Sequence, residues 1–316
     1  MAASRESLSL QCDEAALYSP DEAAALVARL CEALLGVASY AHIVNPELEI
    51  PEESLPELQA ALERLAAGEP LQYVLGYADF LGMRLGVTPA VLIPRPETEE
   101  LCRRVIEAYA PSLPRAILDL CCGSGCITWA MARAFPDALV VGVDLSAEAL
   151  DVARSQNAVI DGFIQADGVL AEPRTPSGAS SSRLSAPLFI QADALQVSEL
   201  LQTLRALLKA YGRSGFDLLL SNPPYVRESE RTQMRRNVLD FEPEMALFVP
   251  DDDPLRFYKA SAELFSSELF APHSFAALEL NEALGESTAA LFQEKKCAVH
   301  LQKDVFEKTR FLFAKK

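Results

Sequence analysis

The chain has 316 residues, half of them hydrophobic, and a formal net charge of −17. At ~150 residues per domain, this length predicts two domains, with enough apolar residues for a sizeable core. The negative charge counts against a nucleic-acid substrate, because nucleic-acid binders need basic patches that release counterions. No apolar stretch approaches the ~20 residues of a membrane span, and the first residues lack the pattern of a secretory signal.

The seven cysteines are an odd number and include the adjacent pair Cys121 and Cys122. A disulfide framework does not suit such a set, so a reducing, cytoplasmic location is expected. The lack of a membrane-spanning stretch predicts no membrane partner. A zinc site needs paired ligands from a second segment. The other cysteines and the three histidines are scattered along the chain, and we therefore expect no bound metal.

Residues 1–75 have the pattern of a small helical domain. Ser19-Pro20-Asp21-Glu22 places a capping serine, a first-turn proline and a glutamate three residues after the cap, and Gly36 marks a stop. Ser54 with Glu57 repeats the capping pattern before a second leucine-rich stretch. Such a domain is either structural or binds a partner, and the pattern alone does not choose.

Residues 76–100 change character. Three glycines punctuate short apolar runs, which predicts a hairpin that links two domains. Pro94-Arg95-Pro96-Glu97-Thr98-Glu99 follows, with two prolines that fix the backbone around Arg95. Thr98 is predicted to cap a helix that begins at Glu99. A rigid interdomain turn with surface charges is an equal alternative.

Strands and helices alternate in residues 101–316, which predicts an α/β domain with a doubly wound, mainly parallel sheet of seven strands. The predicted helices are Ile127–Ala134, Ala147–Gln156 and Val197–Ala210. The predicted strands are Ala116–Leu120, Leu139–Asp144, Leu188–Asp193, Phe216–Ser221, Phe275–Leu280, Ala298–Leu301 and Arg310–Ala314.

A near-repeat complicates the third strand. Phe163–Asp167 and Phe189–Asp193 have almost the same sequence, and the segment Glu172–Ser185, rich in Ser, Pro and Gly, separates them as a predicted surface insertion. Spacing forward from Asp144 favours Asp167 with Gly168. We choose Asp193 with Ala194, because the crossover helix Val197–Ala210 then follows in the expected place.

A glycine turn joins the first strand to a helix. Glycines at such a turn let a ligand approach the backbone, and Thr128 stands where the dinucleotide fingerprint would have its third glycine. An adenosine ligand without phosphates fits better. Asp144 ends the next strand and can accept both ribose hydroxyls, while Asp193 and Ala194 would lie by an adenine edge. The turn comprises Asp119, Cys121, Cys122, Gly123, Ser124 and Gly125.

The strand Phe216–Ser221 ends at Asn222-Pro223-Pro224-Tyr225. Two prolines cannot donate to a sheet ladder, so the strand stops there, at the edge where open α/β sheets bind ligands. The Asn222 side chain and the Pro223 carbonyl can accept hydrogen bonds from an NH2 group, and Tyr225 can stack on a planar group. These residues are suited to holding a planar nitrogen.

These motifs, in this order along nearly the whole chain, resemble the protein-(glutamine-N5) methyltransferases that modify peptide chain release factors. Asn-Pro-Pro-Tyr alone is shared with adenine methyltransferases, but its pairing with Pro94–Glu99 and a helical domain is specific. One departure is Cys121, where the family usually has glycine. A side chain there is expected to crowd the methionine end of the cofactor or to alter the backbone.

The resemblance implies a class I, Rossmann-like methyltransferase with S-adenosyl-L-methionine as cofactor. It implies transfer to the glutamine N5 of the Gly-Gly-Gln motif in release factors, with residues 1–75 recognising this substrate and the enzyme acting as a monomer. Asn222, Pro223 and Tyr225 become the expected catalytic residues, with Pro224 also in the substrate site. The alternative is a nucleic-acid adenine N6-methyltransferase. The only notable basic run of this chain, Arg227–Arg236, could serve such a substrate but is interpreted as a solvated helix face.

Overall fold

The computed structural model describes residues 17–38, 40–45, 49–109, 113–156, 163–164, 170–171 and 186–316. The chain divides into two compact units. The smaller comprises the described residues up to Tyr77 together with Thr232–Glu242, and the larger comprises Ala78–Arg231 and Pro243–Lys316. The segment Thr232–Glu242 therefore packs with helices that precede it by more than 150 positions in the sequence.

The smaller unit is helical, and its core is formed by Val27, Leu30 and Leu65, which are fully buried. The first helix begins with the predicted capping box: the Ser19 hydroxyl accepts from the Glu22 N–H, and the Glu22 carboxylate accepts from the Ser19 N–H. The unit contains α2 (Pro20–Leu35), α3 (Ala41–Val44), η1 (Glu52–Ser54), α4 (Leu55–Ala66), α5 (Leu71–Leu75) and α10 (Arg236–Phe241).

Two helix-end predictions were wrong. Ser54 does not cap α4, because it is the last residue of the short helix η1 and already has helical backbone angles, so its side chain makes no capping bond. Thr98 does not cap a helix at Glu99 either. Helix α6 (Pro96–Tyr109) begins three residues before Glu99, since Pro96 suits the first turn of a helix, and Thr98 lies inside it.

The larger unit is built on a sheet of seven strands in the order β12-β13-β11-β8-β3-β4-β7. β13 is antiparallel to both its neighbours, and the strands from β11 to β7 run parallel. This confirms the predicted fold class. In sheet order, the strands span Ala298–Lys303, Thr309–Lys315, Phe270–Glu279, Phe216–Ser221, Ala116–Leu120, Leu139–Asp144 and Leu188–Gln191.

The near-repeat is separated by this topology. Leu188–Gln191 forms β7, the third parallel strand, on the sheet edge beside β4. Phe163–Ile164 (β5) instead pairs antiparallel with Leu170–Ala171 (β6) in a separate two-stranded sheet. Asp167, Gly168 and the insertion Glu172–Ser185 lie outside the described residues. The strand that precedes the crossover helix is therefore the one that ends before Asp193.

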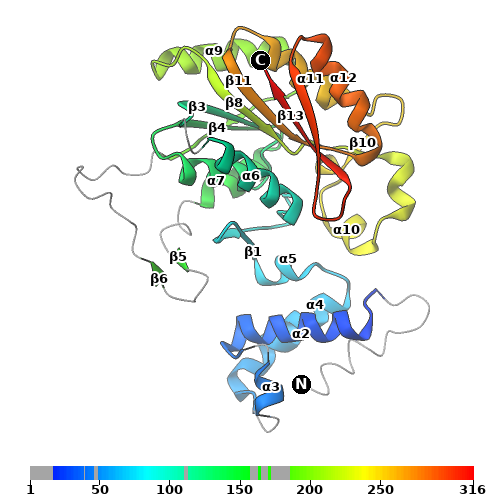
Figure 1. The fold of residues 1–316 in the computed structure, drawn as a ribbon. Coiled ribbons are helices and arrows are strands. Elements are labelled where there is room, and N and C mark those ends of the chain that lie inside the picture. The colour runs from blue at the N-terminus through cyan, green and yellow to red at the C-terminus, as the bar shows by residue number, and fades with distance from the viewer. Residues whose placement is uncertain are drawn as a thin grey trace. The chain divides into compact units, whose positions relative to one another are not determined.

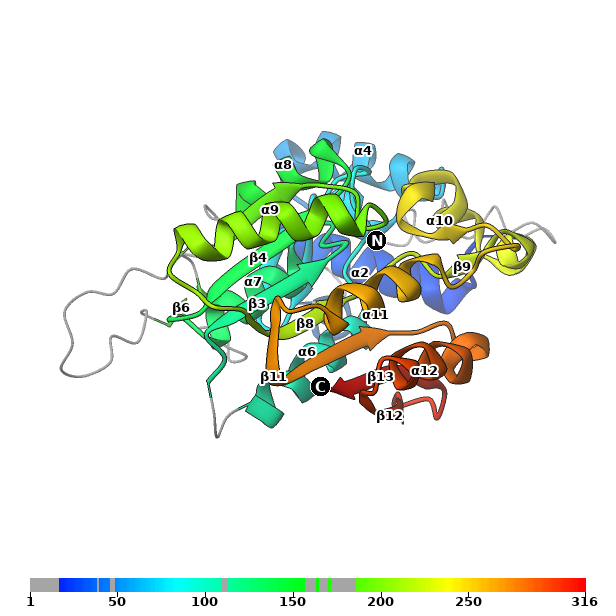
Figure 2. The same ribbon diagram turned by 90° about the horizontal axis from the view of Figure 1, so that it is seen from above.

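Helices cover both faces of the sheet (Figures 1 and 2). α6 and α7 pack on one face around Leu101, Trp129 and Phe311, and α9, α11 and α12 pack on the other around Leu204, Phe265 and Phe292. Strands covered on both faces read as continuous apolar runs, which is why their positions were predictable. The remaining helices span Cys126–Ala134 (α7), Ala147–Ser155 (α8), Val197–Ala210 (α9), Arg256–Ser266 (α11) and Gly285–Glu294 (α12).

Short elements complete the unit. β1 (Tyr77–Phe80) and β2 (Met83–Gly86) form the predicted hairpin, and buried Phe80 and Leu85 join the core beneath α6 and α7. The others are β9 (Val226–Arg227), β10 (Phe248–Val249), η3 (Glu228–Gln233), η4 (Glu244–Ala246) and η5 (Glu282–Leu284). Within the described ranges, no helix is long and apolar enough to cross a bilayer.

Candidate active site

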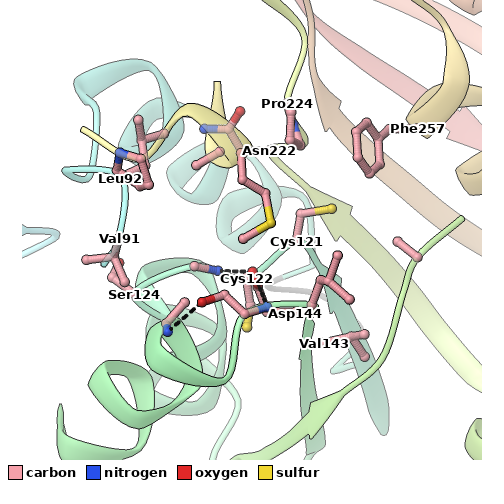
Figure 3. A pocket seen from close by; sticks show the side chains of 18 of the residues that line it. Val91, Leu92, Cys121, Cys122, Ser124, Val143, Asp144, Asn222, Pro224 and Phe257 are labelled. Carbon is pink, nitrogen blue, oxygen red and sulfur yellow. Dashed lines mark hydrogen bonds between the residues drawn. The ribbon is translucent and has the colours of Figure 1, made fainter. Parts of the chain in front are cut away.

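The order of the parallel strands reverses at β3 and β8: β4 and β7 follow on one side of β3, and β8 and β11 lie on the other. At this switch point Leu120 of β3 pairs with Ser221 of β8. In open α/β sheets the crevice beyond the carboxyl ends of such neighbouring strands is the usual ligand site. A cavity of about 330 Å³ lies at this edge. Figure 3 shows Asn222 and Pro224 along one side of the cavity, with Asp144 and Val143 along the other.

Most of the site residues predicted from the sequence line this cavity, although they come from four separate segments. These are Cys121, Cys122, Gly123, Ser124, Asp144, Asp193, Ala194, Asn222 and Pro224. Asp119, Gly125, Pro223 and Tyr225 lie beside it without lining it. The topology therefore brings the glycine turn, the two strand-end carboxylates and the Asn-Pro-Pro-Tyr segment to one place.

The glycine turn has a backbone that favours glycine at three of its positions. Gly123 and Gly125 have φ angles of 52° and 77°. A Cβ on Gly125 would also lie 3.1 Å from the Cβ of Ala153 and 3.2 Å from the Phe189 ring, so the turn packs too closely for a larger residue. Cys121 has a φ of 59° without being glycine. Cys121 therefore has the left-handed backbone that favours glycine.

Asp119 lies fully buried beneath the turn. Its Oδ2 accepts a hydrogen bond from the Thr128 hydroxyl over 2.5 Å, whereas its Oδ1 has no hydrogen-bond partner in the described chain. Burial raises the pKa of Asp119 to about 7, against the opposing effect of the Thr128 hydrogen bond. Thr128, the residue that interrupts the dinucleotide pattern, thus supports the acidic residue that opens the turn.

Asp144 holds the turn from the neighbouring strand. Its Oδ2 accepts from the Gly123 N–H over 2.8 Å and its Oδ1 from the Ser146 N–H over 2.9 Å. Burial raises the pKa of this carboxyl, and the backbone donors oppose the rise by favouring the charged form. An oriented carboxylate that lines the cavity can accept the two hydroxyls of a ribose.

Asp193 follows β7, the strand that lies beside β4 on the side away from β3. Its Oδ1 accepts from the Leu195 N–H over 2.8 Å, and the Ala192 N–H donates to the Asp144 carbonyl over 3.0 Å. Ala194 and Leu195 also line the cavity, together with apolar Val143 and Leu145. This part of the cavity offers polar backbone edges beside apolar walls, as a purine ring requires.

The amide of Asn222 is tied to two residues from distant segments. Its Nδ2 donates to the Thr98 hydroxyl over 2.9 Å, and that hydroxyl donates to Glu279 Oε2 over 2.7 Å. The Tyr225 hydroxyl donates to the other oxygen, Glu279 Oε1, over 2.8 Å. Both Thr98 and Glu279 are 1% exposed. The motifs at Pro94–Glu99 and Asn222–Tyr225 are therefore joined through a buried carboxylate at the end of β11.

Several cavity residues were not indicated by the sequence. Met245 and Phe248 approach from the segment after Glu242, and Arg256 with Phe257 from the start of α11. Apolar residues in loops look the same in a sequence whether they face a ligand or a core. Glu279 does not line the cavity but is joined to Asn222 through Thr98. It carried a usable signal, a carboxylate at the end of an apolar strand, like Asp144.

The cysteines near the turn do not have the properties of nucleophiles. Burial raises the pKa of the Cys126 thiol to about 12 and raises those of Cys121 and Cys122 well above the ordinary value. The reactive thiolate is therefore disfavoured at all three. Within the part of the chain that the structure describes, no three His, Cys, Asp or Glu side chains are grouped to hold a metal ion.

These residues fit a nucleoside that carries a charged methionine group. The Asp144 carboxylate suits a ribose, and the apolar walls suit a purine. These acceptors and apolar walls match the adenosine part of S-adenosyl-L-methionine.

Comparisons with known proteins agree with this geometry. Residues 117–212 match the family described as "Methyltransferase domain", and residues 11–76 match the "PrmC N-terminal domain". The chain is 36% identical over 299 residues to "Release factor glutamine methyltransferase" of Bacteroides thetaiotaomicron, with 94% of each chain covered. The protein of the same name from Flavobacterium psychrophilum is 33% identical over 274 residues, with 85% of this chain and 84% of the relative covered.

Among solved structures, a release factor-specific protein-(glutamine-N5) methyltransferase from Alicyclobacillus acidocaldarius covers 73% of this chain and 99% of its own, at 22% identity and a TM-score of 0.41.

Proposed function

This chain belongs to the family of release factor glutamine methyltransferases, and we propose that it methylates the side-chain nitrogen N5 of a release-factor glutamine. It is a methyltransferase that uses S-adenosyl-L-methionine. The acceptor is the glutamine of a Gly-Gly-Gln motif, as the resemblance implies. The observation that supports this acceptor best is the Asn222 amide, which lines the same cavity as Asp144 and the glycine turn.

The proposed chemistry asks this chain to orient a weak nucleophile. The lone pair of an amide nitrogen is delocalised, so the nitrogen reacts only when it is held in line with the methyl group. The Asn222 oxygen and the Pro223 carbonyl accept its two N–H groups, and Tyr225 packs on the amide plane. Orientation of this kind can save ~7–11 kcal/mol of the barrier.

The cofactor, when bound, supplies an electrophilic methyl group on a positively charged sulfur. The residues of this chain do the rest: Asp144 and the glycine turn bind the adenosine part, and Asp193 with Ala194 lies by the adenine edge. The two acceptors on the substrate nitrogen favour the positive charge that builds up there. The surplus proton leaves to water or to Asn222 afterwards, so no strong base is required.

The helical unit has its own place in the proposal. Residues 1–75 recognise the release factor, residues 76–100 link the two domains, and residues 101–316 carry out the transfer. The match of residues 11–76 to a domain named for this enzyme family supports the first assignment. The proposal also includes a monomeric, cytoplasmic enzyme with no direct nucleic-acid or membrane partner.

The rival acceptor, an adenine in nucleic acid, receives little support from the surface charge. The basic run that could have bound phosphates has acidic partners at each arginine: Arg227 pairs with Glu230, Arg231 with Glu228 and Glu244, Arg235 with Glu22, and Arg236 with Asp240. These pairs neutralise the run, and the chain as a whole carries a charge of −17.

The test is methyl transfer from labelled S-adenosyl-L-methionine to two candidate acceptors, a purified release factor and adenine-containing DNA or RNA. Label on the release factor supports the proposal, and a release factor with its Gly-Gly-Gln glutamine changed to alanine is the matched control. Label on nucleic acid alone would favour the rival. Label on neither would leave a protein that binds the cofactor without using these acceptors.

A further inference from the structure

Thr98 and Glu279 lie behind Asn222, on the side of its Nδ2 atom. The three side chains come from α6, β11 and the segment after β8, and the hydrogen bonds between them measure 2.9 Å and 2.7 Å. Thr98 and Glu279 are separated by 181 positions in the sequence. Only the tertiary fold brings segments so far apart in the sequence into contact. The Thr98–Glu279 bond therefore does not serve a local role, such as capping a helix.

The chemistry of the three groups gives this chain of hydrogen bonds one direction. An ionised carboxylate only accepts, and both Glu279 oxygens already accept, one from Thr98 and one from Tyr225. The Thr98 hydroxyl has a single proton, which is used on Glu279, so it can only accept from Asn222. The Asn222 group that faces Thr98 must therefore be the NH2, since its carbonyl oxygen would meet a lone pair.

Because the Glu279 carboxylate is buried, it depends on the hydrogen bonds that the Thr98 and Tyr225 hydroxyls donate to it. Burial raises the pKa of Glu279, and the hydroxyls of Thr98 and Tyr225 oppose that rise together with the Arg310 guanidinium. Arg310 is itself held by Asp304 at 3.3 Å and by the Leu280 carbonyl at 3.0 Å. The two hydroxyls are therefore the groups that bond the carboxylate directly, and each keeps its own orientation through it.

We propose that Thr98 and Glu279 are positioning residues that fix the Asn222 amide with its carbonyl oxygen toward the substrate nitrogen. Within the part of the chain that the structure describes, Asn222 Oδ1 makes no hydrogen bond, and Asn222 lines the cavity. An amide free to turn by half a rotation would present NH2 to the substrate NH2, and two donors repel. The proposal rests on the proposed function and adds the reason why Asn222 acts as an acceptor.

The experiment compares Thr98→Val with Thr98→Ser. Valine keeps the shape of threonine without its hydroxyl, and serine keeps the hydroxyl without the methyl group. Thr98→Val is expected to lower kcat for release-factor methylation about 10- to 100-fold, because a misoriented catalytic group costs this much. Thr98→Ser should stay within about threefold of the native kcat, because its hydroxyl preserves the relay, the chain of hydrogen bonds from Asn222 through residue 98 to Glu279. Equal losses in both variants would overturn the proposal.

Calorimetric binding of S-adenosyl-L-methionine supplies the readout that does not depend on turnover. Both variants should bind it as tightly as the native protein, with the loss confined to kcat and little change in KM. A loss of cofactor affinity in proportion to kcat would mean that Thr98 shapes the cofactor site and would overturn its assignment as a positioning residue.

Glu279→Gln keeps the test decisive if Thr98→Val fails to fold. A carboxamide has one oxygen for two donating hydroxyls, so either Thr98 or Tyr225 loses its acceptor, and we expect a lower kcat with unchanged cofactor affinity. A native kcat would contradict the relay. If the native protein itself does not methylate the release factor, the proposed function has failed. If it does and all variants match it, only the positioning role has failed.

Discussion

The Asp144 carboxylate accepts a hydrogen bond from the backbone N–H of Gly123 over 2.8 Å, which ties the turn after β3 to the end of β4. The same carboxylate lines the cavity and accepts from the Ser146 N–H through its other oxygen. One side chain therefore orders the glycine turn and presents an acceptor to the ligand. Removing it should affect cofactor binding through both roles.

We expect Asp144→Ala to weaken binding of S-adenosyl-L-methionine about 10- to 100-fold, the range for lost hydrogen bonds to a charged group. Isothermal titration calorimetry measures this directly. Asp151→Ala is the matched control, because Asp151 lies on nearby α8 with 79% of its side chain exposed and outside the cavity. An Asp144→Ala protein with the native dissociation constant would remove Asp144 from the cofactor site.

Asn222→Ala should separate binding from transfer. The alanine removes the acceptor proposed for the substrate nitrogen, so transfer should fall about 10²- to 10³-fold, as it does when one preorganised group is lost. Cofactor affinity should stay near the native value, since Asp144 and the glycine turn are intact. Parallel measurements of kcat and of cofactor binding check this. A loss of affinity as large as the loss of rate would contradict the assigned role.

Cys121→Gly should leave the fold intact or stabilise it. The left-handed backbone costs a non-glycine residue about 1–2 kcal/mol, and the added freedom of glycine in the unfolded chain offsets about 0.5–1 kcal/mol of that gain. Urea unfolding should therefore show a free energy of unfolding that is unchanged or higher by about 1 kcal/mol.

Cys122→Gly is the paired control for this substitution. Cys122 is buried and is not among the residues with a positive φ, so glycine there relieves no strain and removes packing. Its free energy of unfolding should fall by about 1–2 kcal/mol. Equal destabilisation of the two variants would show that the backbone at Cys121 is not strained.

Asp119 should make stability depend on pH. Because burial raises its pKa to about 7, the protonated carboxyl stabilises the folded chain at low pH, and this contribution is lost as the pH rises toward that value. Asp119→Asn has no such proton. The free energy of unfolding of this variant relative to the native protein should therefore rise between about pH 4 and pH 7 and stay level above that. A difference that stays constant over this range would contradict the account.

Much of the larger unit could be predicted from the sequence because its signals are local. Val197–Ala210 has helical periodicity and was predicted with the bounds that the structure shows, and Ala116–Leu120 is an unbroken apolar run that a covered parallel strand requires. The glycine turn follows the end of that strand. Its place in the ligand site was predictable, because open α/β sheets bind ligands at the carboxyl ends of their strands.

The relay behind Asn222 could not be predicted in this way. Thr98 carries the pattern of a helix cap, and only the tertiary fold brings it to Glu279, which lies on another strand. The packing of Thr232–Glu242 with the helical unit is equally non-local. Residues whose roles arise from contacts between distant segments leave no periodicity or spacing to find.

The central claim is tested most directly by locating the methyl group on the product. After reaction with S-adenosyl-L-methionine, the release factor is digested and the peptide that contains Gly-Gly-Gln is sequenced by tandem mass spectrometry. We predict one added methyl group on the glutamine side chain of that peptide, present with the native protein and lost with Asn222→Ala. An unmodified glutamine, or a methyl group on another residue, would contradict the proposed acceptor.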